Sequence, residues 1–235
     1  MLNFFEQFPE LTAIMSEKED GSLRIASDEA IRRKNQKNRE LFFEKFGIDG
    51  GAVVSANLVH GNHVEVVTDA ETKIITKTDA LITTEKGAFL AITIADCVPV
   101  FFYEKEKGIV ALAHAGWRGI VGDVLKNTVD GISSLGGNKN DLFVALGPGI
   151  NECHFEIKAD ALESFADYHE FITKRDGKMF VDLKSIIKKQ LTGLGIKETN
   201  IENNETCTFE ADNLFSFRRD KTPFVDAMIA IIGLK

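Results

Sequence analysis

The sequence predicts an α+β fold in which a β-rich core, a mixed but mostly antiparallel sheet, is flanked by helices. Short β-branched and apolar runs follow one another closely from residue 53 to residue 113, separated by turns such as Glu85–Gly87. Stretches with apolar residues at helical spacing lie before and after this region and do not alternate strictly with the strands. Because no repeat or Pro/Ser-rich linker divides the chain, residues 1–235 are expected to form a single domain.

The individual elements are expected in the following order. A first helix should cover residues 28–46, with Ser27 as its N-cap and Gly47 ending it. The strands of the β-rich region are expected at 53–59, 64–68, 80–84, 89–94, 98–103 and 109–113. The remaining elements are a helix after Gly119, a strand at 142–146, helices at 158–168 and from Asp182, and a buried strand at 225–234. The length of the last run would also permit a helix.

The composition is that of a soluble globular chain and narrows the classes of function. The formal net charge of −8 argues against binding to nucleic acid or to an anionic membrane surface, although a few local Arg residues can still bind an anionic substrate. Residues 1–10 lack the basic start of a secretory signal, and three Cys are too few for a disulfide framework. We therefore expect a cytoplasmic monomer with no nucleic-acid or membrane partner, whose thiols are available for metal binding or catalysis.

Three metal-capable residues stand just past the ends of strand-like runs, namely His60, Cys97 and His114. Side chains at strand ends can converge at one edge of a sheet even when they are distant in the sequence. Two imidazoles and one thiolate suit zinc, and three protein ligands leave a fourth position open, as in catalytic sites. The alternative is that Cys97 is a small buried residue and that the histidines are unrelated loop residues. The residues alone favour this second interpretation.

The segment His114-Ala-Gly-Trp-Arg-Gly119 leads directly into a predicted helix. Backbone N–H groups at a helix start, the helix dipole and the Arg118 guanidinium can together bind one anion, and phosphate is the candidate. Trp117 in the same segment is a candidate to stack on a base. The alternative is a simple strand-to-helix turn with Trp117 packed in the core.

A third set of candidates lies in residues 213–220. Phe215 is suited to stack on a planar base, and Arg218 or Arg219 is suited to bind phosphate or ribose. Alternatively, the segment is a short strand with core Phe side chains and a solvated Arg pair. Cys153 and His154 are adjacent in the sequence, and we expect that they do not form a thiolate–imidazole pair with each other.

Six motifs occur in order along the chain and resemble those of a known family. They are Val59-His-Gly-x-x-Val64, Thr78-Asp-Ala-Leu-Ile82, Thr93-Ile-Ala-Asp-Cys-Val-Pro-Val100, His114-Ala-Gly-Trp-Arg-Gly119, Gly147-Pro-Gly-Ile150 and Phe215-Ser-Phe-Arg-Arg-Asp220. Together they resemble the YfiH-type laccase-domain family, also called the polyphenol oxidase or purine nucleoside phosphorylase family. The resemblance covers roughly residues 50–235.

The resemblance implies an α+β fold and a zinc site with His60, Cys97 and His114 as its catalytic ligands. It also implies phosphorolysis of purine nucleosides, including methylthioadenosine, and deamination of adenosine. The leading hypothesis is therefore a zinc-dependent enzyme that acts on purine nucleosides and phosphate. Candidates for proton transfer in it are Asp79, Asp96 and Glu156.

The chain departs from the family pattern near both ends of the resemblance. Met15–Gly21 lacks the Arg of the family's Thr-Arg-x-Gly-Gly segment, so Lys18 and Arg24 are the candidates to replace it. Residues 221–226 lack the Thr-Gly-Arg often found after the Arg pair. The preferred nucleoside therefore stays open.

Three other functions remain in competition with this hypothesis. A copper-dependent polyphenol oxidase is the first, since a His/Cys site also binds copper, but five His in the chain are too few for a multicopper cluster. The second is a cysteine hydrolase with Cys97 as nucleophile. The third is a non-catalytic nucleoside-binding protein.

Overall fold

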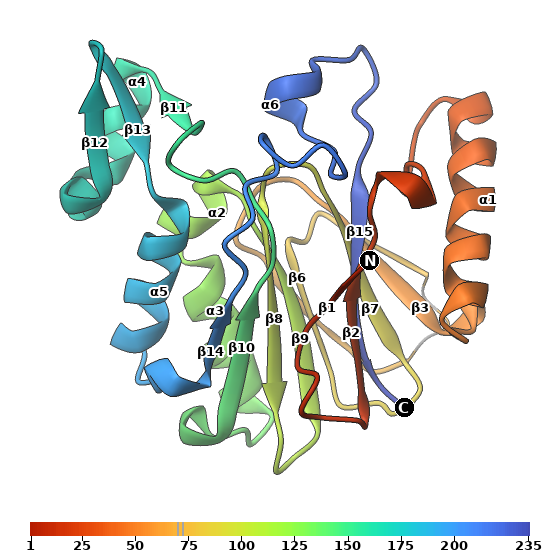
Figure 1. Ribbon diagram of the computed structural model, residues 1–235. Helices are drawn as coiled ribbons and strands as arrows, with labels where there is room; N and C mark the ends of the chain where they lie inside the picture. The colour runs from red at the N-terminus through yellow and green to blue at the C-terminus, as the bar shows by residue number, and fades with distance from the viewer. Residues whose placement is uncertain (70, 72) are drawn as a thin grey trace.

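The computed structural model describes residues 1–69, 71 and 73–235, and it has two six-stranded sheets packed face to face between helices (Figure 1). A third, three-stranded sheet lies at one side. Most strand pairs are antiparallel, and six α-helices flank the sheets. The predicted α+β class, with a mostly antiparallel β-rich core, is therefore confirmed.

The first large sheet joins the two ends of the chain. Its strand order is β1 (Leu2–Asn3), β2 (Leu11–Met15), β15 (Met228–Leu234), β7 (Phe89–Ile94), β3 (Val53–Asn57) and β5 (Ile74–Thr76). The C-terminal strand β15 lies between the N-terminal β2 and β7 and is antiparallel to both. The apolar run near the C-terminus is thus a buried central strand, as predicted.

The second large sheet carries two seven-residue strands, β8 and β9, that are buried along their whole length. Its order is β14 (Ile201–Asn203), β10 (Leu142–Leu146), β8 (Val98–Glu104), β9 (Ile109–Ala115), β6 (Ala80–Thr83) and β4 (Val64–Val67). The small third sheet has the order β11 (Glu156–Ile157), β13 (Lys178–Val181) and β12 (Ile172–Arg175).

Both faces of the second sheet are covered, which explains why β8 and β9 are buried along their whole length. Successive side chains of a strand point to opposite faces. In β8, Val100 and Phe102 therefore pack with the helices, whereas Phe101 and Tyr103 pack against the first sheet. Burial of a side chain of this size contributes about 1.5–3 kcal/mol. A polar residue at any of these positions would be costly.

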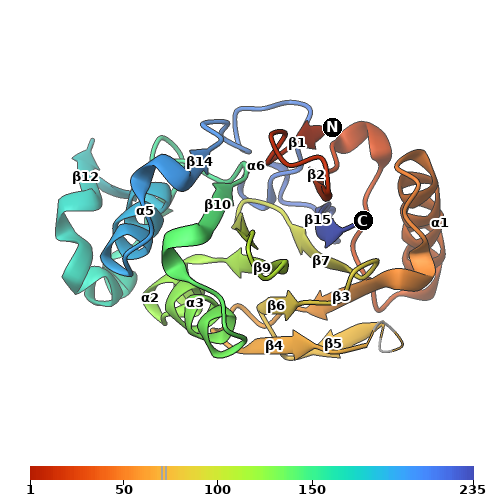
Figure 2. The same cartoon turned by 90° about the horizontal axis from the view of Figure 1, so that it is seen from below.

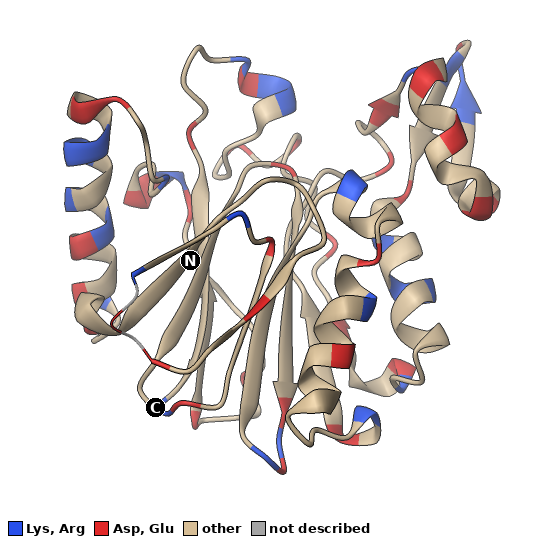
Figure 3. Cartoon of the chain, turned by 180° about the vertical axis from the view of Figure 1, so that it is seen from behind, with Lys and Arg blue, Asp and Glu red and all other residues tan. Residues whose placement is uncertain are grey.

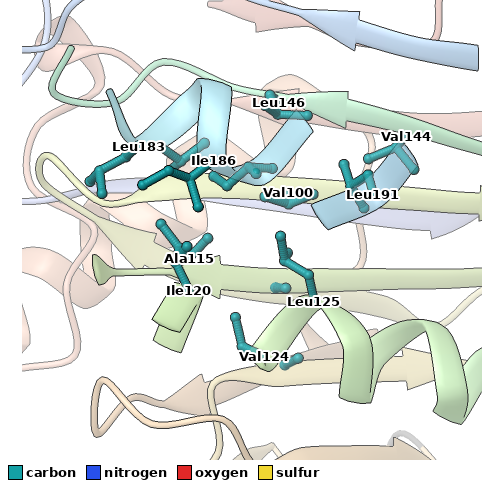
Figure 4. Packing of buried hydrophobic residues seen from close by; sticks show 14 of the residues in the cluster. Val100, Ala115, Ile120, Val124, Leu125, Val144, Leu146, Leu183, Ile186 and Leu191 are labelled. Atoms are coloured by element: carbon teal, nitrogen blue, oxygen red, sulfur yellow. The ribbon is translucent and has the colours of Figure 1, made fainter. Parts of the chain in front are cut away.

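Helices cover the outer face of each large sheet. Helix α1 (Glu29–Lys45) packs on the first sheet through Phe42 and Phe43. On the opposite side, α2 (Trp117–Val121), α3 (Val124–Ser134) and α5 (Leu183–Gly193) cover the second sheet (Figure 2). Side chains of these three helices lie against those of β8, β9 and β10 (Figure 4). The remaining helices are α4 (Ala159–Leu162) and α6 (Phe217–Asp220), with 3₁₀ turns at Lys18–Asp20, Gly50–Ala52, Lys139–Asp141, Glu163–Phe171 and Glu198–Asn200.

The structure corrects three predicted helix details. Asp28 rather than Ser27 caps α1, because its carboxylate accepts a hydrogen bond from the Ile31 amide. The helix expected after Gly119 begins earlier, at Trp117, and is divided where Asp123 adopts a left-handed φ of 70°. The helix expected at 158–168 is α4 followed by a 3₁₀ segment, with non-helical backbone at Phe165 and Tyr168.

The surface carries charges of both signs. Basic and acidic residues are mixed along α1, α5 carries only lysines, and the strands of the two large sheets are largely uncharged (Figure 3). Within the described residues, no helix combines the length and the apolar character that crossing a bilayer requires.

Candidate active site

The three metal-capable residues predicted from the sequence meet at one end of the sheets. His60 follows β3 and Cys97 lies between β7 and β8. His114 is the penultimate residue of β9, which leads into α2. One ligand atom from each lies within 4.8 Å of the other two. The two imidazole rings are nearly perpendicular, with their centroids 4.8 Å apart. This donor set has the chemistry that zinc prefers, and three ligands leave one position open.

Asp79, just before β6, holds both histidines in place. Its Oδ1 lies 2.9 Å from His114 Nδ1 and accepts the His60 backbone amide at 2.9 Å, while its Oδ2 accepts the Gly61 amide at 2.7 Å. Burial alone would raise the pKa of this carboxyl, but the hydrogen bonds from His114 and Gly61 lower it. The Nδ1–H donor of His114 is thus fixed on Asp79, which leaves Nε2 for a metal ion.

Cys97 and His114 also act on each other electrostatically. Burial raises the pKa of the Cys97 thiol, yet the charges and hydrogen bonds of His114 and His60 outweigh it and lower the pKa to about 6. For His114 the effects are reversed. Burial lowers the pKa of its imidazole, but Cys97 and Asp79 outweigh burial and raise this pKa to about 9. The arrangement therefore favours a thiolate at Cys97, the form that binds metals.

The backbone around these residues adopts unusual conformations. His60 and Asp96 have positive φ values of 58° and 87°, which few side chains tolerate. A Cβ atom at Gly116 would lie 3.1 Å from Cys97 Sγ and 3.3 Å from His60 Cδ2. A Cβ at Gly119 would lie only 2.7 Å from the Gly61 carbonyl oxygen. The glycines of the His114–Gly119 segment therefore allow close packing of α2 against the 60–61 loop and beside the three candidate ligands.

These residues form one wall of a cavity of about 490 Å³. Its other lining residues include three arginines, Arg24, Arg118 and Arg218. Asp96 also lines the cavity, but its Oδ1 accepts from the Thr208 hydroxyl and its Oδ2 from the Arg218 amide, both at 2.7 Å. Despite the net negative charge of the chain, the cavity is thus suited to an anionic ligand.

The predicted substrate residues divide into two groups. Arg118, Trp117 and Arg218 line the cavity, and the Arg118 guanidinium lies over the Trp117 ring at 4.3 Å. Phe215 instead packs against the core between the sheets, and Arg219 donates to carbonyls of residues 208–214 and to Asp220. Neither is among the residues that line the cavity.

Phe217 and Arg24 are among the cavity residues that were not singled out as substrate residues from the sequence. Phe217, with 58% of its surface exposed, takes the place in the cavity that was expected for Phe215. Phe217 belongs to the same Phe-Ser-Phe segment as Phe215, but the sequence did not show which of the two Phe side chains faces the core. Arg24, considered only as a replacement for a missing Arg, also lines the cavity. Lys18 lies over the Phe215 ring instead.

Two further expectations concern Glu156 and Cys153. The Glu156 carboxylate pairs with Lys178 at 3.0 Å and does not line the cavity, so it is not positioned for proton transfer there. Cys153 and His154, which were not expected to form a thiolate–imidazole pair, nevertheless lie in contact. His154 Nδ1 lies 3.2 Å from Cys153 Sγ, because a turn at residues 151–154 brings the two side chains to the same side.

Sequence comparisons relate the chain to one family. The family described as multi-copper polyphenol oxidoreductase laccase matches residues 24–235, a longer stretch than the sequence motifs covered. The purine nucleoside phosphorylase of Deinococcus radiodurans is 34% identical over 84% of this chain and 76% of its own length. A purine nucleoside phosphorylase of Campylobacter jejuni is 35% identical, with 88% of each chain covered.

Solved structures show the same fold. Bacillus licheniformis YfiH superposes with a TM-score of 0.88 and is 26% identical, with 98% of this chain and 95% of that chain covered. YlmD of Geobacillus stearothermophilus gives a TM-score of 0.85 at 27% identity, with coverage of 98% and 94%.

Proposed function

Since the chain belongs to the multi-copper polyphenol oxidoreductase laccase family, and similar chains are named purine nucleoside phosphorylase, we propose that it is a zinc-dependent purine nucleoside phosphorylase. The proposal includes phosphorolysis of methylthioadenosine and deamination of adenosine at the same site. One observation carries the proposal: His60, Cys97 and His114 converge in a cavity that is also lined by three arginines and by the aromatic side chains of Trp117, Phe155 and Phe217.

The three donors would hold the zinc ion. The fit is supported by their soft donor set and by Gly116, whose missing side chain leaves room beside all three. When bound, zinc would supply Lewis-acid chemistry at this position. Asp79 would orient the His114 ring through Nδ1, and the protein would thereby keep the donors fixed during turnover.

The remaining cavity residues would bind the two substrates. Trp117 and Phe217 offer ring faces for the purine base, and Arg118, Arg218 and Arg24 offer positive charge for phosphate. In phosphorolysis, a phosphate oxygen forms a bond to the ribose C1′ as the C1′–N bond breaks, and the leaving base takes up a proton. The arginines would neutralise the charge of the phosphate. The cavity would also hold both substrates in a fixed orientation, which speeds the displacement.

The proposal is tested by measuring turnover of inosine, adenosine and methylthioadenosine with and without phosphate. We expect free base and sugar 1-phosphate only when phosphate is present, and inosine from adenosine without it. His114→Ala should abolish these reactions, whereas His63→Ala, at an exposed position three residues from His60, should not. Equal rates for His114→Ala and the wild type would contradict the assignment.

Copper-dependent oxidation of phenols is a second candidate, because the description of the family names it. The same donor set can bind copper. However, only His60 and His114 of the five histidines line the cavity, and His63 and His169 are exposed elsewhere. Metal analysis of protein produced without added copper separates the two candidates: stoichiometric zinc favours the phosphorylase, and stoichiometric copper favours the oxidase.

A further inference from the structure

A second group of soft metal donors lies outside the substrate cavity. Cys153 and His154 follow β10 on the loop that begins at Gly147, and Cys207 follows β14. The two sulfur atoms are 3.7 Å apart, and one ligand atom from each of the three residues lies within 4.8 Å of the other two. None of the three lines the cavity that holds His60, Cys97 and His114.

The surrounding structure holds these donors in place. Gly149 and Cys207 form a parallel β-bridge, so the two segments are tied at their backbones. The Asn151 amide donates to Cys207 Sγ at 3.4 Å. The His154 ring stacks on Phe209, with centroids 4.0 Å apart and an interplanar angle of 14°. These contacts direct the imidazole Nδ1 toward the sulfur atoms rather than toward solvent.

The spacing of the donors agrees with that of tetrahedral zinc ligands. Zn–S bonds of about 2.3 Å and Zn–N bonds of about 2.0 Å place neighbouring ligand atoms about 3.3–3.8 Å apart. The sulfur–sulfur distance of 3.7 Å and the nitrogen–sulfur distance of 3.2 Å lie close to that range. Glu210 Oε1 lies 3.7 Å from His154 Nδ1 on the exposed side, but it is outside the group of donors that lie within 4.8 Å of one another.

We propose that Cys153, His154 and Cys207 form a second zinc site, and that its role is structural. The exposed Glu210 side chain, which lies beside His154, would complete a sphere of four protein ligands when the metal binds, the coordination typical of structural zinc sites. A Cys153–Cys207 disulfide is the competing outcome, since the sulfur atoms are near each other. A disulfide would not use the His154 Nδ1 contact with Cys153 Sγ, which places an imidazole nitrogen beside the two sulfur atoms as a third metal donor.

The second site connects to the cavity through Arg218. The Arg218 guanidinium donates to the carbonyl oxygens of His154 and Glu156, at 3.3 Å and 3.2 Å. A zinc ion at Cys153, His154 and Cys207 would fix the loop that supplies these acceptors and so the position of Arg218. The proposal does not depend on the reaction or on the metal content of the cavity.

Metal content of the full-length protein, purified under reducing conditions without chelator, tests the proposal. Cys207→Ser should lose about one zinc equivalent relative to the wild type, and Cys97→Ser should keep the zinc of the second site. X-ray absorption of Cys97→Ser should then show zinc with two sulfur ligands. His154→Gln, at a partly exposed position, provides a second variant in case Cys207→Ser fails to fold.

The outcomes separate this site from the candidate active site. Loss of zinc in Cys207→Ser and in His154→Gln, with the zinc of Cys97→Ser retained, supports the proposal whether or not the cavity binds metal. Zinc content unchanged in both variants overturns it. A Cys153–Cys207 disulfide found by mass spectrometry in the purified wild type, with no zinc lost from Cys207→Ser, also overturns it and assigns the pair a redox link instead.

Discussion

Asp79 Oδ1 lies 2.9 Å from His114 Nδ1, and the same carboxylate accepts backbone amides from residues 59–61. One fully buried side chain thus joins the end of β9 to the loop after β3, two segments that carry two of the three candidate ligands. Every partner of this carboxylate is a hydrogen-bond donor. Asp79 therefore acts as an orienting residue for the histidines rather than as a free proton carrier.

Asp79→Asn should weaken metal binding about 10- to 100-fold, in line with the loss of a carboxylate that orients a ligating histidine. The amide NH₂ that replaces one oxygen would face a donor and leave it unpaired. Competition with a chelator of known affinity measures the effect. Asp130→Asn, which removes an exposed ion pair with Lys126, is the matched control. Equal affinity in the two variants would refute the orienting role.

Gly116→Ala should lower zinc occupancy without unfolding the protein. The new methyl would lie 3.1 Å from Cys97 Sγ and 3.3 Å from His60 Cδ2, so the donors would have to move apart by a few tenths of an ångström. Metal sites tolerate such displacement poorly, and we expect about a tenfold loss of affinity. Gly193→Ala, with no atom within 4 Å of the added methyl, should retain full occupancy. Metal content and circular dichroism of both variants check the result.

Arg118→Met should raise the KM for phosphate about 10- to 100-fold, because a charge-assisted hydrogen bond contributes about 1.5–3 kcal/mol. Its guanidinium lines the cavity over Trp117, and no ion pair in the described part of the chain neutralises it. The melting temperature should change little. Steady-state kinetics at varied phosphate, beside Arg32→Met on the exposed face of α1, measures the effect. An unchanged KM would remove Arg118 from the phosphate site.

Arg219→Met should instead destabilise the fold. Its guanidinium donates to the carbonyl oxygens of Thr208, Phe209, Ala211 and Leu214, and it pairs with Asp220. Its loss leaves several partly buried acceptors without a partner, and we expect a decrease of about 2–3 kcal/mol in the free energy of unfolding. Chemical denaturation measures it. A stability equal to that of Arg32→Met would show that these contacts contribute nothing.

The different directions of the Arg218 and Arg219 side chains could not be predicted from the sequence. Both were candidates because of their residue type, and only the turn of α6 places Arg218 in the cavity wall and directs Arg219 to the carbonyls of residues 208–214. The same turn places Phe217 in the cavity and leaves Phe215 in the core. Period-2 and period-3.6 patterns cannot resolve a four-residue helix, because it is shorter than either signal requires.

Other features could be predicted because they rest on a long run of apolar residues or on the chemistry of the side chains. Strands β7, β8 and β9 were predicted from β-branched and apolar runs of five or six residues, and their bounds are nearly as predicted. The convergence of His60, Cys97 and His114 was predicted from their positions after strand-like runs together with the family motifs. The approach of Cys207 to Cys153 depends on contacts between segments 54 residues apart, for which the sequence contains no local signal.

Lys184 should make stability rise with pH between about 8 and 10. It is buried on α5, where desolvation lowers its pKa to about 8, although Glu205, Cys207 and Asp182 favour the charged form and Lys188 opposes it. The ammonium group donates to the carbonyl oxygens of Asn204 and Thr206. Above pH 8 the folded protein loses this proton while the unfolded chain keeps it up to its ordinary pKa of about 10.4. The unfolded state then binds more protons, so unfolding becomes less favourable as the pH rises.

The comparison with Lys184→Met isolates this contribution from those of other groups. Between pH 7 and pH 10, the free energy of unfolding of the wild type should gain about 2 kcal/mol relative to the variant. Urea denaturation at several pH values measures the difference. Lys189→Met, which removes an exposed Lys on the same helix, should change stability by the same amount at each pH from 7 to 9. Parallel curves for the wild type and Lys184→Met would mean that Lys184 keeps its ordinary pKa in the folded protein.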